Sequence, residues 1–220
     1  MKMDRRGEIE RLLGEPVTAS PPGSFLPFIR RIDTERLRAS AERFGTPQYC
    51  LDLDRLRERA GLFARTMRSH LPASECFYAF KCNDLPLLVK TLKEAGFQAD
   101  VAGIFELELA LRLGFERILF SGPGKSADEL ALAARNGDRV TVIVDNMDEL
   151  RLLADVAARE GAEPALRIGF RLRGIRSPRA GGNWSKFGIA LDRLPGAIRV
   201  ADDSPRLDWA GLHFHASWNR

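Results

Sequence analysis

The chain has 220 residues, of which 45% are hydrophobic and 29% are charged, and its formal net charge is +4. These values are ordinary for a globular protein with one sizeable core. Basic residues are spread along the chain and no run approaches the roughly 18 apolar residues of a membrane span, so neither nucleic-acid nor membrane binding is indicated. The three cysteines lack the spacing of a zinc motif, and the charged N-terminus has no signal-peptide core. We therefore predict a cytoplasmic protein without a metal site.

The first 75 residues are predicted to be mainly helical. A Pro-Pro-Gly segment marks a loop at 20–24, and Asp33 or Thr34 is the predicted N-cap of a helix that ends before Gly45. The predicted elements are helices at 5–13, 33–44 and 54–69 and a strand at 48–53. Cys50 and Cys76 lie in apolar, strand-like runs and are predicted to be buried thiols. We expect residues 1–45 to be a helical extension of the main domain.

From residue 76 onward, short apolar runs alternate with helical patterns. Such alternation predicts parallel βα units, in either a (β/α)8 barrel or a doubly wound sheet. The predicted strands are 76–80, 98–102, 117–121, 140–145, 165–172 and 207–215. The predicted helices are 85–95, 104–113, 126–136, 146–159 and 191–201.

Lys81 directly follows the first of these strands and is one of only six lysines in the chain. The residues Cys76–Phe80 are all apolar or aromatic, which predicts a strand buried on both faces. A lysine in apolar surroundings has a lowered pKa, and its neutral amine is a nucleophile towards carbonyl groups. The alternative is a lysine at the strand end that extends its ammonium group into solvent.

Polar residues gather where the predicted strands end. In a barrel, the carboxyl ends of all the strands converge on one pocket, where catalysis takes place. Each of these residues could instead be a helix cap or a satisfied polar group of the core. The residues concerned are Asn83, Asp100, Ser121, Asp145, Arg167, His213 and His215.

The segment Ser121-Gly122-Pro123-Gly124-Lys125-Ser126 resembles a phosphate-binding loop but lacks the first glycine of that motif, because Leu119 stands there. We interpret it as a βα turn in which Ser126 is the N-cap and Glu129 completes a capping box.

Two other patterns leave alternatives open. The segment Gly181–Gly188 follows an arginine-rich stretch, 171–179. It either binds an anion, forms an ordered loop over the pocket, or is a long solvated loop. The side chains of His213 and His215 point to the same face of a strand, so a shared metal is geometrically possible, although no carboxylate or cysteine nearby would complete the site. Alternatively, one histidine reaches the pocket and the other packs deeper in the barrel.

Several segments together resemble the pyridoxal-phosphate-dependent decarboxylases of the alanine-racemase-like fold, the family of the diaminopimelate, ornithine and arginine decarboxylases. The resemblance covers about residues 45–217. Its motifs, in order, are Gly45-Thr46-Pro47 with Asp52-Leu53-Asp54, Tyr78-Ala79-Phe80-Lys81-Cys82-Asn83, Gly96–Ala102 with Glu106-Leu107, Ser121–Lys125, Leu166-Arg167-Ile168, Ser185-Lys186-Phe187-Gly188 and Gly211–His215. It implies that 46–220 is a cofactor-binding (β/α)8 barrel of the alanine-racemase type.

The resemblance also implies an activity and a set of site residues. Lys81 would carry pyridoxal 5'-phosphate as an internal aldimine, and Asp100, Glu106 and Arg167 would shape the site. His215 would stack on the pyridine ring. The substrate would be an amino acid of the diaminopimelate, ornithine, lysine or arginine type, and the protein would be a homodimer.

The chain departs from the family pattern in two respects. The family has a glycine-serine pair shortly after His215, which contacts the phosphate, whereas this chain has Ala216-Ser217-Trp218. Ser217 is the predicted cofactor contact in this segment. The chain also ends at Arg220, after about six barrel strands, so we expect an incomplete barrel without the family's C-terminal β-domain. The alternatives are an inactive, decarboxylase-like binding protein and a barrel-only cofactor carrier.

Overall fold

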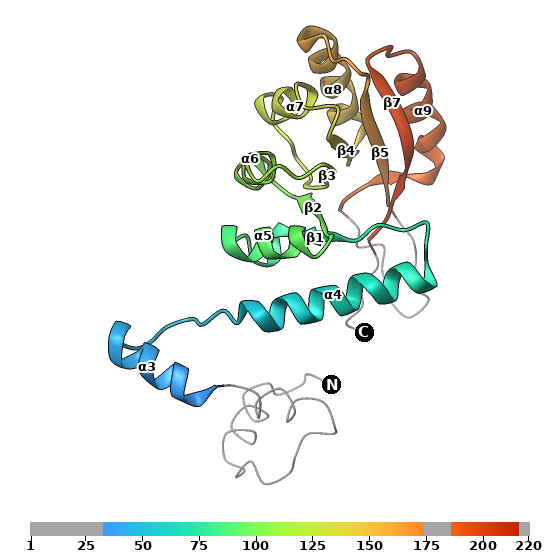
Figure 1. The fold of residues 1–220 in the computed structure, drawn as a ribbon. Coiled ribbons are helices and arrows are strands. Elements are labelled where there is room, and N and C mark those ends of the chain that lie inside the picture. Colours follow the sequence, from blue (N-terminus) through green and yellow to red (C-terminus); the bar gives the residue numbers. More distant parts are fainter. Residues whose placement is uncertain (1–32, 174–185, 216–220) are drawn as a thin grey trace, which may run out of the picture. The chain divides into compact units, whose positions relative to one another are not determined.

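The computed structural model describes residues 33–173 and 186–215 (Figure 1). They belong to two compact units, one ending at Leu51 and one beginning at Asp52. The helix predicted at 5–13 and the loop predicted at 20–24 lie outside the described residues. Among the residues that are described, none of the helices combines the length and the apolar character needed to cross a membrane.

The described part of the first unit contains the predicted helix, α3, at Thr34–Phe44. The Asp33 side chain accepts a hydrogen bond from the Arg36 backbone N–H, as an N-cap should. Gly45 follows the helix with φ of +81°, a conformation that glycine adopts without steric cost. Both ends of the helix are therefore as the sequence predicts.

The strand predicted at 48–53 is wrong. Residues 48–52 have no regular structure, and Tyr49 and Leu51 are exposed. The last part of the run begins a helix instead, because the Asp52 carboxylate accepts the Arg55 backbone N–H and caps α4. No described strand pairs with this segment, so its apolar side chains have no sheet to pack on. Cys50 is accordingly exposed rather than buried.

The second unit alternates strands and helices, and all six strands predicted from residue 76 onward are present (Figure 1). The short strand β6 was not predicted. The strands are β1 Phe77–Ala79, β2 Gln98–Val101, β3 Ile118–Phe120, β4 Val140–Val144, β5 Leu166–Arg173, β6 Ile189–Ala190 and β7 Leu207–His213. The helices are α4 Leu53–His70, α5 Pro86–Glu94, α6 Ile104–Arg112, α7 Ala127–Ala134, α8 Met147–Glu160 and α9 Leu194–Asp202, with short 3-10 helices η1 Phe80–Cys82 and η2 Leu191–Arg193.

Every strand pairing in this sheet is parallel. The main strands follow one another in chain order, β1-β2-β3-β4-β5-β7, and β6 pairs with the end of β5. Within the described ranges β1 pairs only with β2 and β7 only with β5, so the sheet is open there. Helices α5 to α9 lie along one side of the curved sheet (Figure 1).

The core lies between the sheet and these helices. Alternate strand residues are fully buried together with apolar residues of the helices. The strand residues of this set are Ala99, Val101, Ile118, Phe120, Val140, Val142, Val144, Leu166, Ile168 and Phe170. The residues between them, such as Asp100, Thr141 and Arg167, are half-buried on the opposite face. The strands therefore have one apolar face and one face that carries polar groups.

Strand β1 is less buried than the sequence predicts. Cys76 and all three residues of β1 are only partly buried, and Phe80 is the one member of the apolar run that is buried. The reason is that β1 has a neighbouring strand on one side only within the described chain. An apolar run cannot by itself distinguish a central strand from an edge strand.

Candidate active site

The strand ends bring together most of the polar residues that the sequence singles out. Lys81, Asp100, Ser121, Asp145 and His213 come from the ends of β1, β2, β3, β4 and β7 or directly follow them. Because all these strands are parallel, their carboxyl ends lie at the same edge of the sheet. The candidate site is therefore this edge.

Lys81 is exposed and lies in the 3-10 helix that follows β1. Of the two possibilities that the sequence leaves open, the exposure agrees with a lysine at the strand end that extends into solvent. The chain turns at this point, so Phe80 enters the core while its neighbour stays in contact with solvent. The Lys81 charge nevertheless acts on Asp100 and Glu106, where it lowers the pKa of both carboxyl groups.

Asp100 is the electrostatic centre of the site. Burial raises the pKa of its carboxyl group, and the hydrogen bond from the Ser121 hydroxyl, at 2.5 Å, opposes this shift. The neighbouring Lys81, His213 and Arg171 also lower the pKa. One carboxyl group from β2 thus interacts with groups of β5 and β7 and of the segments that follow β1 and β3.

Glu106 has a local structural role. It lies in the first turn of α6, and its Oε2 accepts the Ala102 backbone N–H at 2.7 Å. Burial raises the pKa of this carboxyl group, and the hydrogen bond from Ala102 lowers it. The contact ties the loop after β2 to the helix that follows it.

Gly122 brings the next loop against the same turn. A Cβ atom at this position would lie 1.9 Å from the Ala102 carbonyl oxygen, so only glycine allows the two backbones to approach this closely. The loops after β2 and β3 therefore support each other, and with them the carboxyl group of Asp100 and the hydroxyl of Ser121.

Of the two candidate histidines, the structure places His213 within the group. Its ring is half-buried, and its buried Nδ1 has no hydrogen-bond partner among the described residues. Strand β7 ends at His213, and His215 lies two residues beyond it and is exposed. The stacking role expected for His215 stays a prediction. His213, to which the sequence gave no role, is the histidine that faces Asp100 and Arg171.

The pKa of His213 leads to a first prediction. Burial lowers this pKa, and the positive charge of Arg171 lowers it further. Because the unfolded chain then binds a proton more readily, His213 should reduce stability as the pH falls below about 6.5. The unfolding free energy of the wild type should therefore fall between pH 7.5 and pH 5.5. In the variant with glutamine in place of His213 it should fall by less. We expect a difference below about 1 kcal/mol, because the side chain is only partly buried.

Urea denaturation of both proteins at the two pH values measures this difference. An equal loss in wild type and in the His213 variant would contradict the prediction.

The other predicted site residues lie elsewhere. Arg167 is half-buried within β5, where it is in register with Thr141 and Asp208, and not at the strand end. Ser217 lies outside the described residues. Arg171 lies within the predicted strand 165–172 but was given no role at the site; in β5 it lies on the same face as Arg167. The spacing of four residues along a strand could have indicated this.

The glycine-rich segment 121–126 is a βα turn, as the sequence predicts. Ser126 caps α7, and the reciprocal hydrogen bonds with Glu129 form a capping box. Sequence reasoning missed the role of Lys125, whose side chain is only 1% exposed. Its Nζ donates to the Ile143 carbonyl oxygen at 2.7 Å and to Glu149 Oε1 at 2.9 Å. The ammonium group is thus used within the protein rather than for binding phosphate.

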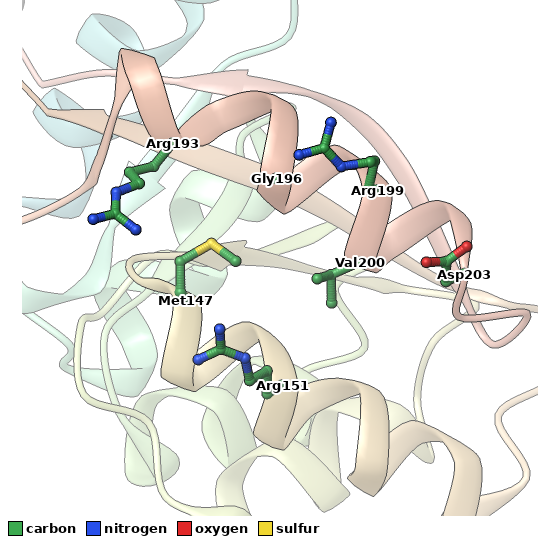
Figure 2. A pocket seen from close by; sticks show the side chains of 7 residues that line it. All are labelled: Met147, Arg151, Arg193, Gly196, Arg199, Val200 and Asp203. Carbon is green, nitrogen blue, oxygen red and sulfur yellow. The ribbon is translucent and has the colours of Figure 1, made fainter.

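A groove of about 540 Å³ lies outside this site, between α8 and α9. Figure 2 shows its side chains, which include Arg151 from α8 and Arg199 from α9. All its residues belong to these helices or directly flank α9, and none comes from a strand end. The groove is therefore separate from the candidate active site.

Known proteins are similar to this chain in both sequence and fold. Residues 56–218 match the family described as pyridoxal-dependent decarboxylase, pyridoxal binding domain. A diaminopimelate decarboxylase of Methanothermobacter thermautotrophicus is 32% identical over 183 residues, which cover 80% of this chain and 41% of that protein. An L-glutamyl acyl-carrier-protein decarboxylase of Niallia circulans is also 32% identical, over 84% of this chain and 43% of its own length.

A solved structure is similar over the same region. The crystal structure of diaminopimelate decarboxylase from Helicobacter pylori complexed with L-lysine has a TM-score of 0.69 and 26% identity. The match covers 83% of this chain and 46% of that one. The chain thus spans less than half the length of these relatives, and its parallel strands with alternating helices match their barrel. The chain belongs to the pyridoxal-dependent decarboxylases, within their pyridoxal-binding domain.

Proposed function

We propose that this chain is the cofactor-binding part of an amino-acid decarboxylase and that Lys81 is the residue that attaches pyridoxal 5'-phosphate. The observation that carries this proposal is the convergence of Lys81, Asp100, His213 and Arg171 at one edge of the sheet. Family membership supports it. The proposed barrel domain is 46–220, and a cytoplasmic location stays a prediction.

The residues present fit this cofactor. The Lys81 amine is exposed, so an aldehyde can reach it. The buried Nδ1 of His213 has no partner among the described residues and is available to a polar group of a ligand. The face that carries Asp100 and Arg171 is half-buried and polar, which suits a charged, planar molecule.

When bound, the cofactor supplies an electron sink for the carbon that loses its carboxylate. The chain's own residues attach and orient it. Lys81 provides the primary amine for a carbon–nitrogen bond. The carboxyl group of Asp100, which interacts with Lys81 and His213, balances positive charge beside that bond. Glu106 and Gly122 hold the loops that position these groups.

The absorbance spectrum of the protein after addition of pyridoxal phosphate tests this proposal. We expect an absorbance band near about 420 nm, typical of the cofactor bound to a lysine. Release of carbon dioxide from diaminopimelate, lysine, ornithine or arginine would identify an active enzyme. A band without carbon dioxide release would favour a cofactor carrier or an inactive binding protein. The absence of any band would contradict the proposal.

The substrate class rests on the relatives alone. Those compared include a diaminopimelate decarboxylase and an L-glutamyl acyl-carrier-protein decarboxylase at the same identity, so we propose an amino acid or amino-acyl group as substrate. We also propose a homodimer, as the family resemblance implies. Analytical ultracentrifugation tests the dimer, and a monomer at micromolar concentration would contradict it.

A further inference from the structure

Arg171 lies on the candidate site, at a position to which no motif gives a role. It is in register with His213 of β7, so both side chains belong to the same face of the sheet. Burial has the largest effect on both pKa values, since it raises the pKa of Asp100 and lowers that of His213. The positive charge of Arg171 lowers both. The guanidinium therefore lies close to the proposed cofactor site.

The guanidinium is mostly removed from solvent but makes few bonds. Its side chain is 14% exposed, and its ion pair with Asp145 spans 3.6 Å, which is longer than a hydrogen bond. It also lies over the Phe187 ring, 5.0 Å from the centroid. It donates no hydrogen bond to any residue that the structure describes. A guanidinium has five N–H donors, so Arg171 keeps several for a ligand.

Asp145 is held in place independently of Arg171. Its Oδ1 accepts the Gly188 backbone N–H at 3.1 Å, and its own backbone N–H donates to Glu149 Oε1 at 3.1 Å. Glu149 is in turn fixed by its buried ion pair with Lys125. A carboxylate held in this way can orient the guanidinium and balance its charge when no ligand is bound.

From this geometry we propose that Arg171 is the anion-binding residue of the site and that Asp145 is its positioning residue. The inference rests on the proposed function and adds the group that is recognised: two oxygens of a carboxylate or a phosphate. The planar fork of a guanidinium matches such a pair of oxygens, and it binds them more strongly where water is largely excluded. The phosphate of the cofactor and the carboxylate of the amino acid both offer this chemistry.

Arg171→Gln tests the proposal, because glutamine keeps a polar side chain but loses the charge and the fork. Pyridoxal phosphate and pyridoxal, which lacks the phosphate, are titrated by absorbance against the full chain. L-Lysine and cadaverine, which is lysine without its carboxylate, are then titrated against the cofactor-loaded chain. If Arg171 binds phosphate, the variant should bind pyridoxal phosphate about 10- to 100-fold more weakly than the wild type does, with the same affinity for pyridoxal. If Arg171 binds the carboxylate, the affinity for lysine should fall to that extent, and the affinity for cadaverine should not change.

Three further variants complete the test. Arg171→Lys keeps the charge without the fork and should weaken the same ligand by a smaller factor. Asp145→Asn should weaken that ligand as well, while Arg173→Gln, at an exposed position of the same strand, should have no effect. Circular dichroism shows whether each variant is folded.

Two results would overturn the inference while the proposed function stands. In the first, Arg171→Gln leaves all four affinities unchanged although the wild type shows its cofactor band. In the second, the variant weakens charged and uncharged probes equally, which indicates a purely structural role. A wild-type chain that binds no cofactor would overturn the proposed function and this inference together.

Discussion

Replacing Lys81 with alanine should abolish the absorbance band of the cofactor-loaded protein completely. Alanine has no amine to form the carbon–nitrogen bond, so pyridoxal phosphate would bind only through weaker, non-covalent contacts. Any carbon dioxide release by the wild type should fall by at least about 1,000-fold, because the attached cofactor would be lost. Visible absorbance and the rate of carbon dioxide release measure the two effects.

The structure offers a matched control for this experiment. Lys90 is an exposed lysine of α5, only nine residues further along the chain, and its replacement with alanine should leave the band intact. Reduction with sodium borohydride would fix the cofactor to its lysine, and peptide mass spectrometry would then identify the residue. A cofactor adduct on Lys90 or on Lys125, with Lys81 unmodified, would show that the assignment is wrong.

Replacing Glu149 with leucine should destabilise the protein by about 3–5 kcal/mol. The side chains of Glu149 and Lys125 are 4% and 1% exposed, so the variant would leave a buried ammonium group without its counter-ion. Burial already lowers the pKa of Lys125, which shows that removal from water disfavours the charged form. Equilibrium denaturation in urea gives the change in unfolding free energy.

A double variant separates the lost ion pair from other effects. Changing Lys125 to methionine together with Glu149 to leucine removes both charges and should recover most of the stability. About 1 kcal/mol should remain lost, because the Asp145 backbone N–H also loses its acceptor. As a control, Glu160→Gln breaks the more exposed pair with Arg135 and should cost at most about 1 kcal/mol. A double variant as unstable as the Glu149 variant would contradict this account.

The same ion pair bears on the proposed site. Glu149 holds the backbone of Asp145, and Asp145 holds Arg171 and Gly188. The destabilising Glu149 variant should therefore also weaken the binding of the anion by Arg171. The buried pair of Lys125 and Glu149 would thus support ligand binding at the candidate site through Asp145.

Several elements could be predicted from the sequence because their signals are local. The capping box of Ser126 and Glu129 depends on residues three positions apart, and the helix after Asp33 depends on its own cap and on Gly45. Alternation of apolar strands with helices likewise predicted the parallel sheet, since each crossover needs a helix.

Other predictions failed because burial depends on neighbours that are distant in sequence. The apolar run at 48–53 has the composition of a strand but no described partner strand, and Cys50 within it is exposed. The sequence left open whether Lys81 lies in apolar surroundings or extends into solvent. Because β1 is an edge strand in the described chain, the lysine contacts solvent. Composition describes a residue's own preference and not the surface that will cover it.

By itself, the sequence determined the order of the elements from residue 76 onward except β6, the parallel sheet and the position of Lys81 after its first strand. Only the tertiary structure decided which polar residues meet, because Asp100 of β2, Arg171 of β5 and His213 of β7 are far apart in the sequence, the nearest two being Arg171 and His213, which are in register. It placed His213 rather than His215 beside Asp100, and it brought Arg171 to the site. It also paired Lys125 with Glu149, since a buried charge must find its partner wherever the fold supplies one.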